Sequence, residues 1–161
     1  MSLGLDEEKA QAGEAERQVD DLYGKLRIIW LAILAGLVAV FVVTRLVEGR
    51  AGGGLDVVFW ILLAVGAVGQ AASFVLKEKM LKQSAAEQKP ELARSAYILA
   101  YALCESVALL GLVAHFITGH RYYYWLFIIG GFGVVVHKPQ RDDLLAAVSG
   151  AGRVWEAKKQ G

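Results

Sequence analysis

The sequence predicts an all-α fold: a polytopic membrane protein built as a four-transmembrane-helix bundle, with both termini cytoplasmic and an amphipathic C-terminal helix. Three observations lead to this fold class. Apolar residues make up 56% of the 161 residues and charged residues only 20%, which is more apolar and less charged than the average soluble domain. The charges gather at the two ends of the chain and in one middle segment. The apolar stretches between them have about the 20-residue length that a helix needs to cross a bilayer.

The elements expected along the chain follow from this distribution. Residues 1–27 carry many charges of both signs and are expected to form a charged cytoplasmic helix that leads into the membrane. Four transmembrane spans follow, over residues 28–47, 57–76, 95–118 and 122–137. The polar segment between the second and third spans is expected to be helical on both sides of a turn near Pro90. The fourth span is the shortest, and the aromatic cluster Tyr122–Trp125 is expected to anchor it at the membrane surface.

The Lys and Arg residues are distributed unequally between the two sides of the expected membrane. Fourteen lie in the N-terminal tail, in the segment between the second and third spans, and in the C-terminal tail. The other three are Arg45, Arg50 and Arg121, which lie at or in the two remaining loops. Because basic residues favour the cytoplasmic side, this pattern predicts that both termini are cytoplasmic, in a bacterial inner membrane. The chain then divides into the N-terminal helix 1–27, a transmembrane domain 28–137 and a cytoplasmic tail 138–161.

Small residues at helical spacing indicate where the expected helices pack. The third span has such residues at four-residue steps and a glycine after them, and the second span contributes one more glycine. These positions are Ala96, Ala100, Cys104, Ala108, Gly111 and Gly69. Small side chains let helices approach closely in lipid, where packing drives association. We therefore expect a compact bundle.

The C-terminal tail carries an apolar stripe at helical spacing, beside basic residues. Its members are Leu144, Leu145, Val148 and Trp155. Such a helix is typical of a segment that lies on a membrane surface. Docking of the same stripe against a partner subunit is the alternative interpretation.

One carboxylate, Glu105, lies near the middle of the third span, about 15 Å from either end. An ionised side chain at that depth costs at least about 2.5–3.5 kcal/mol, so the group must be protonated, hydrogen-bonded, ion-bound or exposed to a polar cavity. Three polar residues are candidate partners: Tyr101 one turn earlier, Ser106 next in sequence, and Gln70 in the second span. Either Glu105 gains and loses an ion, or it is protonated and locks helices through a hydrogen bond to Tyr101 or Gln70.

The segment Ala-Leu-Cys-Glu-Ser-Val-Ala-Leu-Leu-Gly-Leu-Val, residues 102–113, resembles the carboxylate-bearing helix of the c subunit (proteolipid) family of rotary ATP synthases. In that family the Glu precedes Ala or Ser, and a Gly-Leu-Val follows six to eight residues later, where this chain has residues 111–113. The resemblance extends over about residues 66–116. It implies a helical hairpin with H⁺ bound at Glu105, or Na⁺ bound with the help of Gln70 and Ser106. Two further spans flank the hairpin here.

Two functions stay open at this point. In the first, the protein is a subunit of a membrane complex that binds or relays H⁺, or alternatively Na⁺, at Glu105. In the second, it is a non-transporting accessory or scaffold subunit in which Glu105 is protonated and structural. Expected partners are the lipid bilayer and other membrane subunits or further copies of the chain.

Other functional classes are not expected from the sequence. The three histidines lack metal-ligand spacing, one cysteine excludes a multi-cysteine metal site, and no phosphate-binding or nucleophile motif is present. A net charge of +1 does not favour nucleic acid as a partner. The chain is therefore not expected to be an enzyme or to hold a cofactor or a metal.

Overall fold

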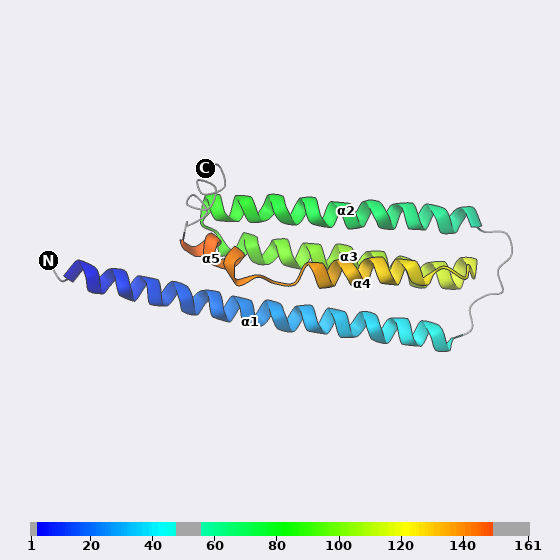
Figure 1. Cartoon of the computed structure of the whole chain (residues 1–161), viewed down its shortest axis with the longest axis horizontal. Coiled ribbons are helices and arrows are strands. Elements are labelled where there is room, and N and C mark those ends of the chain that lie inside the picture. The colour runs from blue at the N-terminus through cyan, green and yellow to red at the C-terminus, as the bar shows by residue number, and fades with distance from the viewer. Residues whose placement is uncertain (1–2, 48–55, 150–161) are drawn as a thin grey trace.

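The computed structural model describes residues 3–47 and 56–149 of the chain. Within them the chain forms five helices and no strand: α1 (Leu3–Leu46), α2 (Asp56–Glu87), α3 (Pro90–Thr118), α4 (Tyr124–Val136) and α5 (Arg141–Ser149). The first four run along the long axis of the molecule, and α3 and α4 are seen between α1 and α2 (Figure 1). The predicted all-α class is confirmed.

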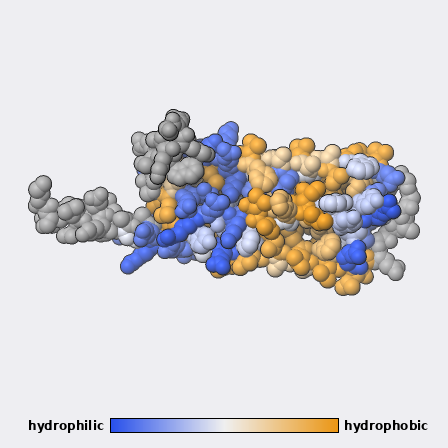
Figure 2. Space-filling view, in the orientation of Figure 1, coloured by the Kyte–Doolittle hydropathy of each residue, from blue (hydrophilic) through white to orange (hydrophobic). Residues whose placement is uncertain are grey.

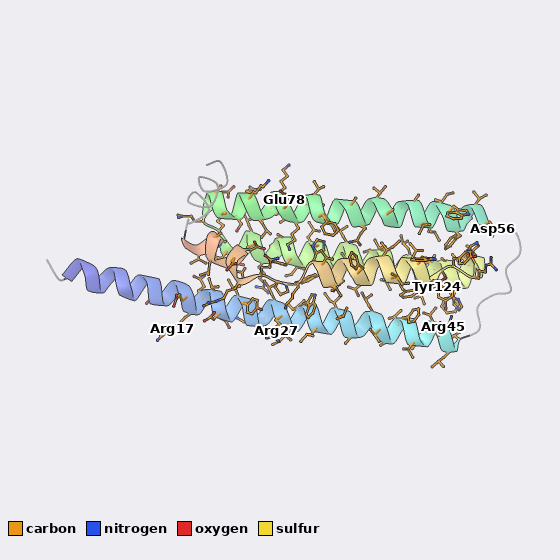
Figure 3. All side chains as sticks on the ribbon, viewed as in Figure 1. Arg17, Arg27, Arg45, Asp56, Glu78 and Tyr124 are labelled. Atoms are coloured by element: carbon orange, nitrogen blue, oxygen red, sulfur yellow. The ribbon has the colours of Figure 1, made fainter. Side chains whose placement is uncertain are left out.

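Three of these helices are long and apolar enough to cross a membrane, by length and composition: residues 16–46 of α1, all of α2 and all of α3. The fourth expected span corresponds to α4, which is apolar but has only 13 residues. On the face that Figure 2 shows, apolar residues gather over one part of the bundle, and polar residues gather over the part that holds α5 and the α2–α3 turn. We call that part the charged end, and the opposite end, marked by Arg45, Asp56 and Tyr124 in Figure 3, the far end.

The helices at the charged end continue beyond the expected spans. No proline interrupts the sequence from the N-terminal segment into the first apolar stretch, and α1 is one continuous helix. Helix α2 likewise runs on to Glu87, and α3 already begins at Pro90, whose missing N–H is tolerated in a first turn. The turn between them places Gln88 at a positive φ of 53°, and the Ser84 hydroxyl closes it by donating to the Lys89 carbonyl oxygen at 2.6 Å.

Helix α3 lies at the centre of the bundle and carries most of the small residues singled out in the sequence. Ala96, Ala100, Cys104 and Ala108 are at most 1% exposed, and Gly111 is buried. Gly69 of α2 is half-buried, and a Cβ atom there would lie 3.5 Å from a methyl group of Val107. Helix α1 joins this bundle through a long-range bond, in which the Trp30 indole Nε1 donates to the Val134 carbonyl oxygen at 2.7 Å.

A second hydrophobic cluster lies at the charged end, where α5 folds back against α1 and α3. It contains Val19, Leu26, Ala93, Tyr97, Tyr101, Leu144 and Ala147. Arg141 of α5 also forms an ion pair with Asp20 of α1, with 2.9 Å between Nη2 and Oδ1.

This cluster changes the interpretation of the C-terminal stripe. Leu144 is completely buried, and Leu145 and Val148 pack partly buried against the same cluster. Leu144 is therefore an internal core residue and does not belong to a free membrane or partner surface. The physical reason is that Val19 and Leu26, seven residues apart, give the charged first part of α1 an apolar face that α5 covers. Trp155, the fourth residue of the stripe, lies outside the described residues.

Candidate functional site

Glu105 lies half-buried near the middle of α3, at the border between the buried and the exposed faces of that helix. Its neighbour Cys104 is fully buried, whereas Ser106 is exposed. Across the described residues 3–47 and 56–149, the Glu105 carboxylate makes no hydrogen bond and no ion pair. The carboxylate in the middle of this helix thus has no partner within the described chain.

The three residues proposed as companions of Glu105 are placed elsewhere. The Ser106 hydroxyl is exposed and donates to the Ala102 carbonyl oxygen of its own helix at 2.7 Å. The Gln70 amide donates from Nε2 to the Cys104 sulfur at 3.6 Å. Tyr101 is completely buried, and its hydroxyl has no hydrogen-bond partner among the described residues. The expected hydrogen bond from Glu105 to Tyr101 or Gln70 is therefore not formed.

The position of Gln70 has a packing cause. Its amide lies against Gly133 of α4, where a Cβ atom would be only 2.1 Å from Nε2 and 2.7 Å from the Cys104 sulfur. The glycine thus makes room for the Gln70 side chain between α2, α3 and α4. The amide nitrogen is used there, while the buried Oε1 has no partner among the described residues.

Ser73 connects this amide to a buried histidine. Its hydroxyl lies 2.7 Å from the Gln70 carbonyl oxygen, 2.9 Å from Nε2 of His137 and 3.8 Å from the Cys104 sulfur. A serine has one hydrogen to donate, and the carbonyl oxygen can only accept it. Nε2 of His137 is therefore assigned as the protonated nitrogen that donates to Ser73. His137 is 1% exposed and follows α4 directly.

A second polar group lies nearby at the charged end, around Tyr97. The Tyr97 hydroxyl donates to Oδ2 of Asp143 at 2.5 Å and accepts from the backbone N–H of Gln140 at 3.0 Å. Lys77 of α2 lies over the Tyr97 ring, with Nζ 4.3 Å from the ring centroid. Lys77 also interacts electrostatically with both Asp143 and His137, so it stands between the two polar groups.

The two polar groups together form what we call the charged-end network. It comprises Gln70, Ser73, Lys77, Tyr97, Cys104, His137, Gln140 and Asp143. It joins α2, α3 and α5 with the chain that follows α4.

Sequence reasoning missed this network, although a signal was present. Gln70, Ser73 and Lys77 are spaced at i, i+3 and i+7, so they lie on one face of α2. Ser73 is small enough to suit helix packing, and His137 ends an apolar stretch, so each has a simpler interpretation when considered alone. The spacing becomes informative only when the three polar positions of α2 are considered together.

The far end carries a different set of contacts. His120 stacks on Phe59 with ring centroids 4.0 Å apart, and its Nε2 lies 3.6 Å from Oδ1 of Asp56. An apolar pocket of about 390 Å³ opens between the start of α2 and the start of α4. It is lined by Phe59, Trp60, Leu63, Tyr122, Trp125 and Ile129.

Chemically, several of the described side chains are of types that can hold or pass a proton. They include a partnerless carboxylate, two buried phenols, a buried imidazole and a carboxylate at the charged end. No group of three His, Cys, Asp or Glu side chains lies close enough to hold a metal ion in the parts of the chain that the structure describes. No protein-family model, curated protein or solved structure matches this chain.

Proposed function

We propose that this protein is a small integral membrane subunit that binds and releases a proton at Glu105, as part of a larger membrane complex. The observation that carries the proposal is a half-buried carboxylate in the middle of α3, without a partner in the described chain. An apolar environment favours the neutral carboxylic acid over the carboxylate. A group with no internal partner can change between the two forms without breaking a bond in the bundle.

A purely structural role for Glu105 receives less support. That role needs a hydrogen bond that holds two helices together, and such bonds contribute on average only about 0.6 kcal/mol in membranes. Gln70 of α2, the side chain that could form such a bond between helices, makes no hydrogen bond to Glu105, and neither does Tyr101 of the same helix. A carboxylate within a membrane helix is by default a candidate functional site.

A proton is favoured over Na⁺ as the bound ion. A sodium site would need several oxygen ligands around Glu105. The Ser106 hydroxyl is committed to its own helix, and the Gln70 amide lies against Gly133. A single carboxylate without such neighbours can take up a proton, whereas it coordinates a metal ion poorly.

The proposed orientation has the charged end in the cytoplasm and the far end outside, in a bacterial inner membrane. The unequal distribution of Lys and Arg supports it, because the N-terminal part of α1, the α2–α3 turn and the C-terminal tail hold most of the basic residues. Helix α4 has 13 residues and is shorter than a usual transmembrane helix, so its role as a fourth span is part of the proposal.

Carbodiimide labelling tests the proposal directly, because the reagent modifies protonated carboxyl groups in apolar surroundings. The full chain in lipid vesicles is treated over a range of pH values, and modified residues are identified by mass spectrometry. We expect Glu105 to be labelled at low pH and to lose labelling as pH rises, with no effect of added Na⁺. The exposed Glu91 serves as an internal control that should stay unlabelled. A Glu105 that is unreactive at every pH contradicts the proposal, and protection by Na⁺ favours a sodium site.

The second candidate function is a non-transporting scaffold subunit. The first turns of α1 extend past the ends of the other helices (Figure 1), which supports a contact with another protein. The two functions predict opposite effects of Glu105→Gln in the native membrane. A scaffold keeps the complex and its activity in that variant, whereas a proton-binding subunit keeps assembly and loses the proton-dependent activity.

A further inference from the structure

Three polar side chains follow one another along α3 at one-turn steps: Tyr97, Tyr101 and Glu105. Side chains on a helix lean toward its N-terminus, so Glu105 leans toward Tyr101 and Tyr101 toward Tyr97. The two tyrosine rings are adjacent, with centroids 6.1 Å apart, and both side chains are completely buried. The series therefore leads from the middle of α3 toward the charged end.

Asp143 ends this series at the charged end. The Tyr97 hydroxyl donates to its Oδ2 at 2.5 Å, and the residue itself is half-buried while its neighbour Asp142 is exposed. Lys77 offsets the negative charge of Asp143 through an electrostatic interaction. Asp143 is thus a carboxylate with one side bonded to the buried tyrosine and another side accessible from the polar end.

Tyr101 is the middle member, and its bonding is unusual. Its hydroxyl is buried without a partner among the described residues, which costs on the order of 1–3 kcal/mol. A buried hydroxyl with both its hydrogen and its lone pairs available can accept a proton on one side and donate its own on the other. The hydroxyl is therefore free to serve a relay once a contact to either neighbour forms.

We propose that Tyr101, Tyr97 and Asp143 form the route by which protons pass between Glu105 and the charged end, an inference that rests on the proposed function of Glu105. Tyr101 is not hydrogen-bonded to Glu105 or to Tyr97 in this structure, so both transfers need a side-chain rotation or a bridging water molecule. On release, the Glu105 carboxylic acid gives its proton to Tyr101 in this way, and Tyr101 gives its own proton onward to Tyr97. Tyr97 then passes its proton to the Asp143 carboxylate, which loses it to solvent. Each tyrosine gains one proton and loses one, so only Glu105 and the solvent change. The Tyr97 hydroxyl already points its proton at Asp143, as this direction requires.

Other titratable groups also face the route. Lys77 approaches Tyr97 from α2, and Cys104 on α3 interacts electrostatically with Tyr101. His137 interacts with Lys77, and the Arg141–Asp20 ion pair lies beside α5. None of the hydrogen bonds of His137 reaches Tyr101 or Glu105 within the described chain, so we place the histidine outside the route.

The test follows the protonation of Glu105 by time-resolved infrared spectroscopy after protons are released from a caged compound on one side of oriented vesicles. The carboxyl band of Glu105 is identified by its loss in Glu105→Gln. In the wild type we expect the band to rise sooner after release on the charged-end side than on the far side. Tyr101→Phe should slow this rise roughly 10²-fold, the usual size of the loss when a positioned proton-transfer group is removed, and leave its final amplitude unchanged.

Two further variants keep the result interpretable. Asp143→Asn retains an acceptor for the Tyr97 hydroxyl but cannot carry the proton, and it should slow the rise as well. Ser106→Ala is the matched control, because it removes a hydroxyl beside Glu105 that lies off the route, and its rate should equal that of the wild type. Tyr101→Phe is expected to fold, since it removes only an unpaired hydroxyl.

The possible results separate the route from the proton site. A wild-type rate in Tyr101→Phe, or a faster response to protons released on the far side, overturns the route while Glu105 remains a proton site. If no titrating band is lost in Glu105→Gln, the proton site itself is wrong and the route fails with it.

Discussion

Gly130 of α4 lies directly against the backbone of Cys104 of α3. A Cβ atom at Gly130 would stand 2.6 Å from the Cys104 carbonyl oxygen and 2.8 Å from the Ala108 nitrogen, closer than real Cβ contacts occur. The glycine at this point therefore lets the two helix backbones touch, a common device in membrane helix packing. The same contact positions α4 so that Gly133 accommodates Gln70 and His137 reaches Ser73.

The first prediction concerns this backbone contact. Gly130→Ala should lower the free energy of unfolding by about 1–3 kcal/mol, because the new methyl group meets backbone atoms that cannot rotate away. Gly131→Ala is the matched control, since a Cβ atom there has nothing within 4 Å. It should have a small or slightly stabilising effect, because Ala forms helices better than Gly. Unfolding of both variants in a denaturing detergent measures the difference, and equal stabilities would show that the helices do not touch at Gly130.

The second prediction concerns the buried bond between Ser73 and His137. Ser73→Ala leaves Nε2 of His137 without its acceptor in a site that is 1% exposed, which should cost about 1–3 kcal/mol. Ser106→Ala removes a hydroxyl that bonds only to its own helix and faces outward, so its effect should stay within about 0.5 kcal/mol. The free energy of unfolding in detergent distinguishes the two.

A structural consequence follows from the same bond. The bond to Ser73 links His137, at the end of α4, to α2. Because Ser73→Ala removes this bond, the variant should also increase proteolysis of the nearby segment that joins α4 to α5. Equal stability and equal proteolysis in the two serine variants would contradict the assignment of Ser73 as the acceptor of His137.

The elements that the sequence predicts well are those set by local composition. The apolar stretches predict the helices because a helix satisfies its own backbone groups, and the Pro90 turn follows from the chemistry of proline itself. The extension of α2 to Glu87 agrees with the helix expected on both sides of the Pro90 turn. The burial of Leu144 requires knowing that α5 folds back onto Val19 and Leu26, a contact between distant parts of the chain.

The candidate site shows the same division. Glu105 can be recognised from the sequence alone, because a charged residue within an apolar transmembrane stretch is costly and needs an explanation. The hydrogen-bond partners expected for Glu105 could not be predicted from the sequence in the same way. The direction of the Gln70 side chain, for example, depends on a glycine in another helix, Gly133. The bond between Tyr97 and Asp143 joins residues 46 positions apart and depends on how α5 packs. Such contacts are tertiary and have no local signal.

The last prediction tests whether α5 belongs to the core of the protein. Leu144→Ala should lower the free energy of unfolding by about 2–5 kcal/mol, because Leu144 is completely buried and its loss leaves a cavity beside α1 and α3. Leu46→Ala applies the same chemical change to a side chain that is 79% exposed, and should cost about 0.5 kcal/mol or less. Since the cavity loosens α5, Leu144→Ala should also speed amide hydrogen exchange over α5 and around Val19, and leave exchange in α4 unchanged. If Leu144→Ala behaves like Leu46→Ala in both measurements, α5 is not packed on α1, and its apolar side is available to a membrane or a partner.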